Sequence, residues 1–335
     1  MAVTVAVDGR GVERGSAVLI EGARIALADG IALRVFGDPA ELAGLDGAEI
    51  IDAPEQISND ADPVRAVRTG ERASVVMAAG DVAAGASQAV VSAGPTGATM
   101  TAALFALRRL SGVRRPALAL QLAVPGRSGP PTLLLDVGAN TEVRPQDLVQ
   151  FGVLGAAFSR AVLEVPSPRV ALLSVGEEEK KGTPEVIDAH SQLAGLEGID
   201  FVGNVEGRDL LSGVADVIVT DGFTGNVALK TLEGTAKAVA AAVGAAARSN
   251  PVAAFGGLLL RPALSGLRRE LDPDTTGGAI LLGLRSPAVV AHGSSGPQGV
   301  ANAIRLAVRT VEEGAIERTA ELLAGSGATR GELAG

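Results

Sequence analysis

The sequence contains no cysteine, no tryptophan and no tyrosine, and it has two histidines, His190 and His292. Without cysteine the chain has no disulfide, no thiolate nucleophile and no cysteine ligand for zinc or an iron–sulfur cluster. Two histidines are too few for a multi-histidine metal centre, so we expect no metal site. Any acyl transfer must therefore proceed without a thioester on the protein itself.

Aromatic residues make up 2% of the chain, and the formal net charge is −9. Base-stacking surfaces and a uniformly basic face are therefore not expected, which argues against nucleic-acid binding. The apolar runs near 238–247 and 251–260 are shorter than the roughly 18 residues that suggest a membrane-spanning helix. The first residues lack the charged segment and cleavage site of a signal peptide. These features predict a cytoplasmic protein.

Short apolar runs alternate with longer helical patterns along the chain. Most of the runs are continuously apolar, which is typical of strands covered by helices on both faces. The pattern predicts an α/β fold with a largely parallel sheet and crossover helices. The expected strands are 3–7, 32–36, 49–51, 89–92, 133–136, 170–174, 201–203, 217–220 and 289–291. The expected helices are 15–28, 73–84, 97–110, 146–163, 184–194, 224–247 and 298–324.

The length of 335 residues corresponds to one large or two modest domains. Because no repeat or low-complexity linker divides the chain, we predict a single α/β catalytic unit over residues 1–325. Two lobes around a cleft within that unit stay open as an arrangement. Residues 326–335 have too little apolar content to pack and are expected to form a loose tail.

Four expected strands end in glycine-rich turns, which are 92–99, 136–140, 221–226 and 292–296. Glycine lets the backbone approach a ligand, and the amide groups at a helix N-terminus favour an anion. Each turn alone is more often a plain helix cap. In an open α/β sheet, however, such turns gather at the carboxyl ends of the strands, where ligands bind. Four of them together predict an anion site.

A charged segment at 174–182 follows another apolar run and contains three glutamates and then Lys180 and Lys181. A lysine in such a loop is suited to binding phosphate as a point charge or to stabilising a developing oxyanion. The alternative is an ordinary solvated loop.

A further pattern, the glycines of 9–15 with Asp38, resembles a dinucleotide-binding fingerprint, but its spacing is not G-x-G-x-x-G. We therefore expect no dinucleotide cofactor.

Six segments spread over nearly the whole chain carry motifs that occur together in one protein family. They are DADPVRAVR (60–68), LLDVGAN (134–140), VGEEEKKG (175–182), VGNVEGRD (202–209), VTDGFTGNVALK (219–230) and AHGSS (291–295). In this order the segments resemble the phosphate acyltransferases of bacterial phospholipid synthesis, the PlsX family. The resemblance implies transfer of a fatty acyl group from acyl carrier protein to inorganic phosphate, which gives acyl phosphate.

The resemblance also implies a fold related to the phosphotransacetylases and the isocitrate and isopropylmalate dehydrogenases, a homodimer, and no cofactor. At matching positions it implies that Lys181, with Lys180 beside it, binds phosphate or the oxyanion, and that Asn226 orients the carbonyl or the phosphate. The residues expected to line the site are Ser92, Thr96, Gly97, Asn140, Asp221, Gly222, Thr224, Gly225, Ser294 and Ser295.

Two roles are open for His292: general acid for the leaving thiol, or a capping or core residue. His190 lies within an expected helix and is expected at its surface.

The loop Val7-Asp-Gly-Arg-Gly11 stands where the family usually has Asp-Ala-Met-Gly-Gly-Asp, and Pro95 stands where it usually has asparagine. Proline removes both the side-chain amide and a backbone donor. The alternative function is therefore a repurposed or non-catalytic homologue that binds acyl carrier protein or another acyl or phosphate ligand.

The apolar segment 251–260 precedes several arginines and leucines at helical spacing, which are Arg261, Leu264, Leu267, Arg268, Arg269 and Leu271. This pattern suits a hairpin whose tip enters a membrane interface, and it predicts peripheral membrane contact through residues 251–271. A buried core segment or a dimer contact is the alternative.

Acyl carrier protein is acidic, so a local basic patch is also expected on this protein. The candidates are Arg108, Arg109, Arg114 and Arg115.

Overall fold

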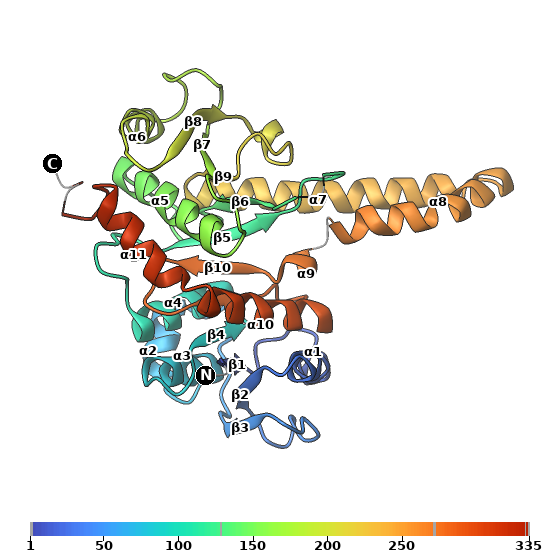
Figure 1. The fold of residues 1–335 in the computed structure, drawn as a ribbon. Coiled ribbons are helices and arrows are strands. Elements are labelled where there is room, and N and C mark those ends of the chain that lie inside the picture. The colour runs from blue at the N-terminus through green and yellow to red at the C-terminus, as the bar shows by residue number, and fades with distance from the viewer. Residues whose placement is uncertain (1–2, 128, 271–272, 332, 334–335) are drawn as a thin grey trace.

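The computed structural model describes residues 3–127, 129–270, 273–331 and 333, which form one sheet of 11 strands with helices on both faces (Figure 1). The strands are β1 (Thr4–Asp8), β2 (Ala32–Gly37), β3 (Glu49–Asp52), β4 (Ala89–Ser92), β5 (Ala117–Leu122), β6 (Thr132–Leu135), β7 (Arg169–Leu173), β8 (Asp200–Val205), β9 (Val217–Val219), β10 (Ala279–Leu282) and β11 (Ala288–Val290). The helices are α1 (Ser16–Ala28), α2 (Pro63–Thr69), α3 (Ser74–Ala83), α4 (Thr96–Leu107), α5 (Pro145–Ala161), α6 (Pro184–Ala194), α7 (Gly222–Ala247), α8 (Pro251–Glu270), α9 (Pro273–Thr276), α10 (Pro297–Glu312) and α11 (Ala315–Gly325), with a 3₁₀ turn at Gly207–Asp209.

The sheet has the strand order β3-β2-β1-β4-β11-β10-β5-β6-β9-β7-β8. The strands from β3 to β11 are parallel to one another, and so are the strands from β6 to β8. Between these sets, β10 is antiparallel to β11 and β5, and β5 is antiparallel to β6. The largely parallel α/β sheet is confirmed, but its two parallel sets run in opposite directions.

Two strands at the centre of the sheet, β5 and β10, are absent from the sequence prediction. Their sequences, ALALQL and AILL, consist mostly of alanine and leucine, which favour helix, and contain one β-branched residue. All residues of both strands are buried. Pairing on both edges and burial on both faces therefore decide their conformation against local propensity.

Two helix boundaries and one unpredicted helix differ from expectation for local reasons. The expected helix 298–324 divides into α10 and α11 at Gly314, whose φ of 58° interrupts the helix. Helix α4 stops at Leu107 because Arg108 takes a φ of 60°. The unpredicted α2 begins at Pro63, and the Asp62 carboxylate caps it by accepting a hydrogen bond from the Arg65 amide at 2.7 Å.

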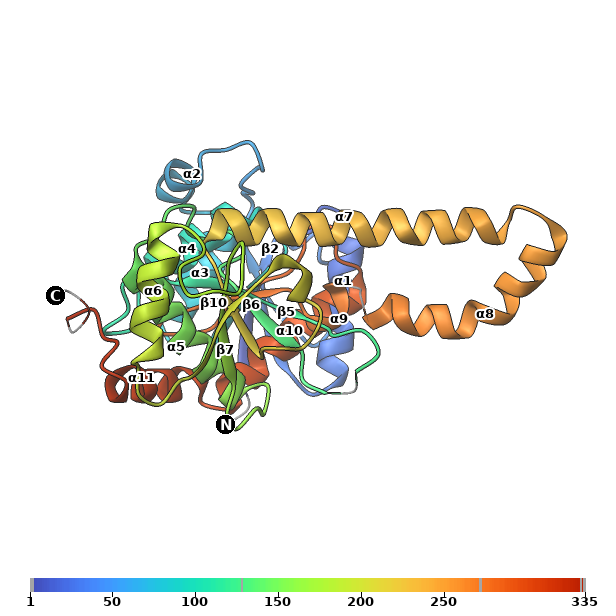
Figure 2. The same ribbon diagram turned by 90° about the horizontal axis from the view of Figure 1, so that it is seen from above.

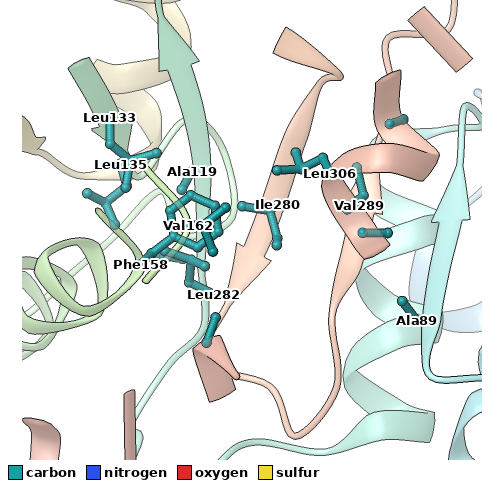
Figure 3. Close-up of a cluster of buried hydrophobic side chains, with 14 of the residues drawn as sticks. Ala89, Ala119, Leu133, Leu135, Phe158, Val162, Ile280, Leu282, Val289 and Leu306 are labelled. Atoms are coloured by element: carbon teal, nitrogen blue, oxygen red, sulfur yellow. The ribbon is translucent and has the colours of Figure 1, made fainter. Parts of the chain in front are cut away.

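Apolar layers pack on both faces of the sheet. Helices α1, α5, α6, α10 and α11 cover one face, and α3, α4 and α7 cover the other (Figure 2). On the first face Phe158 and Val162 lie against Ala119 of β5 and against Ile280 and Leu282 of β10 (Figure 3). The central antiparallel strands thus form part of the largest buried cluster.

The segment after α11 is packed where it is described, in contrast to the expected loose tail. Ala328 is fully buried, and its carbonyl oxygen accepts a hydrogen bond from Gln150 Nε2 of α5 at 2.7 Å. The Arg330 amide donates to the Gly112 carbonyl at 2.7 Å, and Leu333 packs against the core. Small residues and backbone hydrogen bonds hold this segment in place although its apolar content is low.

Helices α7 and α8 form a hairpin that projects from the body of the molecule in both views (Figures 1 and 2). Near its tip Gly257 approaches Ala247, and a Cβ on Gly257 would lie 2.8 Å from the Ala247 Cβ. Apolar side chains of α8 are 58–81% exposed, namely Val252, Phe255, Leu258, Leu259 and Leu260. The segment 251–260 is therefore outside the core, whereas residue 271 lies outside the described residues.

No helix in the described part of the chain combines the length and the apolarity needed to cross a membrane.

Candidate functional site

The residues expected to form one site fall into two groups in the structure. One group follows β4 and β11 and contains Ser92, Thr96, Gly97, His292, Ser294 and Ser295. The other follows β6, β9 and β7, which are neighbouring parallel strands, and contains Asn140, Lys180, Lys181, Asp221, Gly222, Thr224, Gly225 and Asn226. The strands of the two groups point in opposite directions, so the turns do not gather at a single sheet edge.

A buried carboxylate organises the first group. Asp8, at the end of β1, accepts hydrogen bonds at 2.6 Å from the hydroxyls of Ser74 and Ser92. The Ser92 Oγ in turn accepts bonds from the Gly94 amide at 3.0 Å and from the Thr99 hydroxyl at 3.1 Å. Burial raises the pKa of the Asp8 carboxyl, and the two serine hydrogen bonds oppose part of this shift. Ser92 thus supports the loop from within and is closed to solvent.

The start of α4 has one exposed and one packed position. Thr96 is exposed at the first turn, where a ligand can reach its hydroxyl. Gly97 faces α2, and a Cβ there would lie 2.9 Å from Pro63 Cγ. Pro95 is the N-cap residue of α4 and supplies no side-chain cap. Gly97 is therefore needed for the close packing of α4 on α2.

The turn after β11 is held by its own histidine. The Ser294 amide donates to His292 Nδ1 at 3.2 Å, and the Ser294 hydroxyl lies 2.8 Å from the same nitrogen. Because an amide hydrogen points at Nδ1, the neutral ring carries its proton on Nε2. Ser295 is buried, and its amide donates to the His292 carbonyl at 2.8 Å. This geometry fits the capping role for His292.

A second buried carboxylate organises the loop after β6. Asp136 Oδ1 accepts from the amides of Leu118, Gly138 and Ala139 at 2.9–3.1 Å. Its Oδ2 accepts from the Asn140 amide and from Asn140 Nδ2, both at 2.7 Å. Burial raises the pKa of the Asp136 carboxyl, and these donors oppose the shift. The loop is therefore shaped by one carboxylate and a set of backbone amides.

The N-terminus of α7 packs directly on that loop. The Gly222 amide donates to the Asn140 carbonyl at 2.7 Å, and a Cβ on Gly222 would lie 2.8 Å from the Asn140 backbone. A Cβ on Gly225 would overlap the carbonyl oxygen of Asp136. Asp221 caps the helix by accepting from the Thr224 amide at 2.8 Å. Because Gly222 and Gly225 have no side chain, the N-terminus of α7 packs closely against the loop after β6.

Asn226 is the exposed polar side chain that faces the same loop. Its Cβ and Cγ would lie 3.8 Å from a Cβ placed on Gly138, so the two residues are adjacent. Thr224 is exposed in the turn before it. A ligand that approaches the Gly138 backbone therefore meets the Asn226 amide.

The lysine loop follows β7, beside β9. Both lysine side chains are exposed, and neither Lys180 nor Lys181 forms an ion pair with any described residue. The Lys181 amide donates to the Glu178 carbonyl at 3.0 Å, and its carbonyl accepts from the Ser174 hydroxyl at 2.9 Å. Two cations are thus presented on a turn whose backbone is fixed.

His190 is buried, whereas the sequence predicted a surface position, and it is linked through Asn204 to the loop that carries the two lysines. It is 8% exposed and packs edge-on against Phe201. Its Nδ1 lies 3.0 Å from Asn204 Oδ1, and Asn204 Nδ2 donates to the Glu178 carbonyl at 2.9 Å. The polar ring is buried because it has this partner.

Asp8 and Asp136 are the residues that the sequence reasoning missed. Both follow an apolar strand directly and precede a glycine within three residues. That position, an acid at the end of a buried strand, was the available signal. No cluster of three or more metal-binding side chains occurs among the described residues. The arrangement offers cations, an amide and backbone donors for an anion.

The sequence has close relatives among curated proteins. The phosphate acyltransferase of Elusimicrobium minutum is 48% identical over 274 residues, which cover 82% of this chain and 79% of the relative. The phosphate acyltransferase of Bacillus licheniformis is 42% identical over 315 residues, which cover 92% of this chain and 94% of the relative. Identity at this level extends over nearly the whole chain.

Solved structures share the fold at low identity. A phosphotransacetylase from Streptococcus pyogenes superposes with a TM-score of 0.60 at 17% identity and covers 92% of this chain and 94% of its own. A branched-chain phosphotransacylase from Enterococcus faecalis gives a TM-score of 0.59 at 17% identity and covers 92% and 99%. The expected relation to the phosphotransacetylase fold is confirmed. Residues 3–318 match the family described as fatty acid synthesis protein, so the chain belongs to this family and the resemblance to PlsX is confirmed.

Proposed function

We propose that this protein transfers a fatty acyl group from acyl carrier protein to inorganic phosphate and releases acyl phosphate for phospholipid synthesis. The observation that carries the proposal is the identity to curated phosphate acyltransferases along most of the chain. The chemistry also suits the residue inventory, because a phosphate nucleophile needs an anion site and an oxyanion stabiliser but no enzyme thiol.

In the proposed reaction a phosphate oxygen attacks the thioester carbonyl carbon. A carbon–oxygen bond forms and the carbon–sulfur bond breaks through a tetrahedral oxyanion. Hydrogen phosphate loses its proton as it becomes acylated, and the carrier thiolate takes up one proton to become a thiol. The balance needs no metal, cofactor or oxidant. The protein's task is to hold two anions against the carbonyl and to stabilise the oxyanion.

We assign the charged steps to the second group. Lys181, with Lys180 beside it, supplies cations for phosphate or for the oxyanion, since neither is neutralised by a described acid. Asn226 orients the carbonyl or the phosphate beside the Gly138 backbone. The remaining residues of this group, Asn140, Asp221, Gly222, Thr224 and Gly225, set the shape of the site.

The first group lies at the other edge of the sheet, and in this proposal its exposed Thr96 and Ser294 are candidates for separate substrate contacts. Ser92, Gly97 and Ser295 support these turns from positions that are buried or packed. His292 keeps both roles expected from the sequence, general acid for the leaving thiol or cap of its own turn, because its bonds to Ser294 involve Nδ1 and not the Nε2 proton that an acid would donate.

The test is acyl-phosphate formation from long-chain acyl carrier protein and phosphate, with hydroxylamine as the trap. Formation of acyl hydroxamate that depends on phosphate supports the proposal. Carrier binding without product would instead support the non-catalytic homologue. Product from small acyl thioesters but none from the acylated carrier would support a related transferase with another donor. Both alternatives rest on the altered loop at Asp8–Gly11 and on Pro95, and the product assay with both donors, together with a carrier-binding measurement, decides between them.

We also propose peripheral membrane contact through the α7–α8 hairpin. The exposed Phe255, Leu258, Leu259 and Leu260 present a large apolar surface away from the body. Such surfaces on a helix partition into the headgroup region of a bilayer. An amphiphilic acyl product also makes a membrane-adjacent enzyme useful. In the same proposal the enzyme is cytoplasmic and homodimeric.

Sedimentation with anionic vesicles tests the contact. The Leu258→Glu/Leu259→Glu variant should lose vesicle binding, while Val64→Glu/Val202→Glu, at exposed apolar positions of the body, should retain it. Equal sedimentation of both variants would place the contact elsewhere. The molar mass of the untreated protein in solution decides between monomer and dimer.

A further inference from the structure

A cavity of about 800 Å³ opens between the C-terminal half of α4 and the loop after β6. Five arginines line it: Arg108, Arg109, Arg114, Arg115 and Arg330. They come from the segment after α4 and from the segment after α11, which the fold brings together. In a chain with a net charge of −9, this concentration of guanidinium groups makes a local field opposite to the overall charge.

The positive charge of the cavity is only partly compensated. Asp147 is 1% exposed, lies 3.0 Å from Arg114 Nε and 3.8 Å from Arg115 Nε, and is the one described acid paired with this set. Arg108, Arg109 and Arg330 form no ion pair with any described residue. The Arg109 guanidinium donates a hydrogen bond to the Arg114 carbonyl, but the positive charges of all three exposed arginines are not neutralised by a described acid and can attract an anionic partner.

Arg108 occupies a backbone conformation that suits glycine. Its φ is 60° and its ψ is 164°, a region in which a side chain is strained. Its carbonyl accepts a hydrogen bond from the Arg285 amide at 3.2 Å, which fixes the bend after α4. A glycine would make this bend without strain, so Arg108→Gly removes the side chain and keeps the bend.

Apolar residues of α4 and β10 also line the cavity, which reaches the loop of the proposed site at Asn140. Met100 and Leu104 of α4 and Leu281 of β10 line it together with Asn140. Asn140 is bonded to Asp136 and to the N-terminus of α7, so the cavity ends beside the loop that Asn226 faces. The cavity thus combines a cationic rim with an apolar passage toward the second group.

The C-terminal segment that contributes Arg330 to the cavity lies on the other side of the molecule from the exposed hairpin. In Figures 1 and 2 the C-terminal segment after α11 lies on the left, and the α7–α8 hairpin projects to the right. A bilayer that holds the hairpin tip would therefore lie on the other side of the molecule from α11 and the segment after it. The position therefore favours a soluble anionic partner over lipid headgroups.

We propose that this arginine-lined cavity is the docking surface for acidic acyl carrier protein, with the rim arginines contacting its carboxylates and the apolar passage admitting its acylated arm. The inference rests on the proposed function for the identity of the partner. Electrostatic complementarity of this kind raises the association rate and is weakened by salt.

The test measures binding of fluorescently labelled acyl carrier protein by anisotropy. The Arg109→Glu/Arg330→Glu variant should raise the Kd at least about tenfold at low salt, and the difference should shrink at high salt. The matched control is Arg309→Glu/Arg318→Glu, which makes the same charge change on exposed residues of α10 and α11. The same Kd for both variants would overturn the proposal. If the glutamate variant is misfolded by circular dichroism, Arg109→Gln/Arg330→Gln replaces it.

Arg108→Gly separates docking from structure. Relief of the backbone strain should leave the thermal midpoint equal or higher, while the Kd for the carrier rises. A rise in both midpoint and affinity would overturn the assignment of Arg108. Loss of anionic-vesicle binding with carrier binding intact would identify the cavity as a lipid site and also overturn the proposal.

The outcomes also distinguish this inference from the proposed function. If the wild type makes acyl phosphate but the variants bind the carrier normally, the docking surface is wrong and the function stands. If the wild type binds the carrier through the arginines but makes no acyl phosphate, the docking surface stands and the function is wrong. A wild type that does not bind the carrier contradicts both.

Discussion

Asp8 and Asp136 occupy corresponding places in the two halves of the sheet but are satisfied in different ways. Each is a buried carboxylate with a raised pKa at the end of an apolar strand. The hydroxyls of Ser74 and Ser92 give Asp8 its shortest hydrogen bonds, whereas four backbone amides and the Asn140 side chain hold Asp136. Hydroxyl groups rotate, and backbone amides do not.

The difference indicates how each loop responds to change. A network of hydroxyls can reverse the direction of its hydrogen bonds, so the Asp8 loop tolerates a neutral side chain. A carboxylate that accepts from fixed amides determines the path of its loop, so the Asp136 loop does not. The Asp136 loop also supports the N-terminus of α7, which makes it the more rigid of the two.

The largest effect is expected at Gly225. In Gly225→Ala the new methyl group overlaps the Asp136 carbonyl, and α7 must move away from the loop. We expect a loss of about 3 kcal/mol or more in the free energy of unfolding. Denaturant unfolding measures it. The control is Gly234→Ala on the same helix, where nothing lies within 4 Å, and it should stabilise by about 0.5–1 kcal/mol. Equal stability of the two variants would show that the loop and α7 are not coupled.

Lys181→Ala tests whether the second half of the molecule carries the chemistry. Loss of one cation at the anion site should lower turnover about 10²–10³-fold, the scale for a lost oxyanion donor. The fold should be unaffected, because the side chain is exposed. Steady-state rates with the acylated carrier measure the effect. Lys237→Ala, an exposed lysine on α7, should keep the wild-type rate, and a wild-type rate for Lys181→Ala would remove this residue from the mechanism.

Asp136→Asn should destabilise the protein by about 2 kcal/mol. The new amide group cannot accept from Asn140 and cannot turn without losing the amides of Gly138 and Ala139. Thermal or denaturant unfolding measures the loss. A value no larger than that of Asp8→Asn would contradict the contrast between fixed and rotatable donors.

The smallest effect is expected for Asp8→Asn, about 1 kcal/mol, since the hydroxyls of Ser74 and Ser92 can reorient. The change should also alter the pH dependence. A carboxyl whose folded-state pKa is raised above its usual 3.8 stabilises the protein while protonated, and this contribution is lost as pH rises through the folded-state pKa. The midpoint of the wild type minus that of the variant should therefore fall as pH rises from 3.8 through the folded-state pKa of Asp8. A constant difference would show that Asp8 does not titrate in this range.

Much of the local structure followed from sequence patterns. The β-branched runs of β1, β2, β4 and β9 and the helices with clear caps or apolar stripes were predicted within a few residues. These elements depend on propensity, capping and periodicity, which are properties of neighbouring residues. The six motifs likewise identified the family without reference to the fold. The absence of cysteine alone excluded thiol chemistry.

Tertiary structure decided the features that depend on distant residues. Pairing at both edges made strands of the leucine-rich β5 and β10, and their antiparallel directions separated the expected site into two groups. Packing on α5 ordered the segment around Ala328, and a partner at Asn204 buried His190. The same fold gathered Arg330 with the arginines after α4. Strand direction and the meeting of remote loops arise from the whole sheet, because no local pattern encodes which strand a segment will pair with.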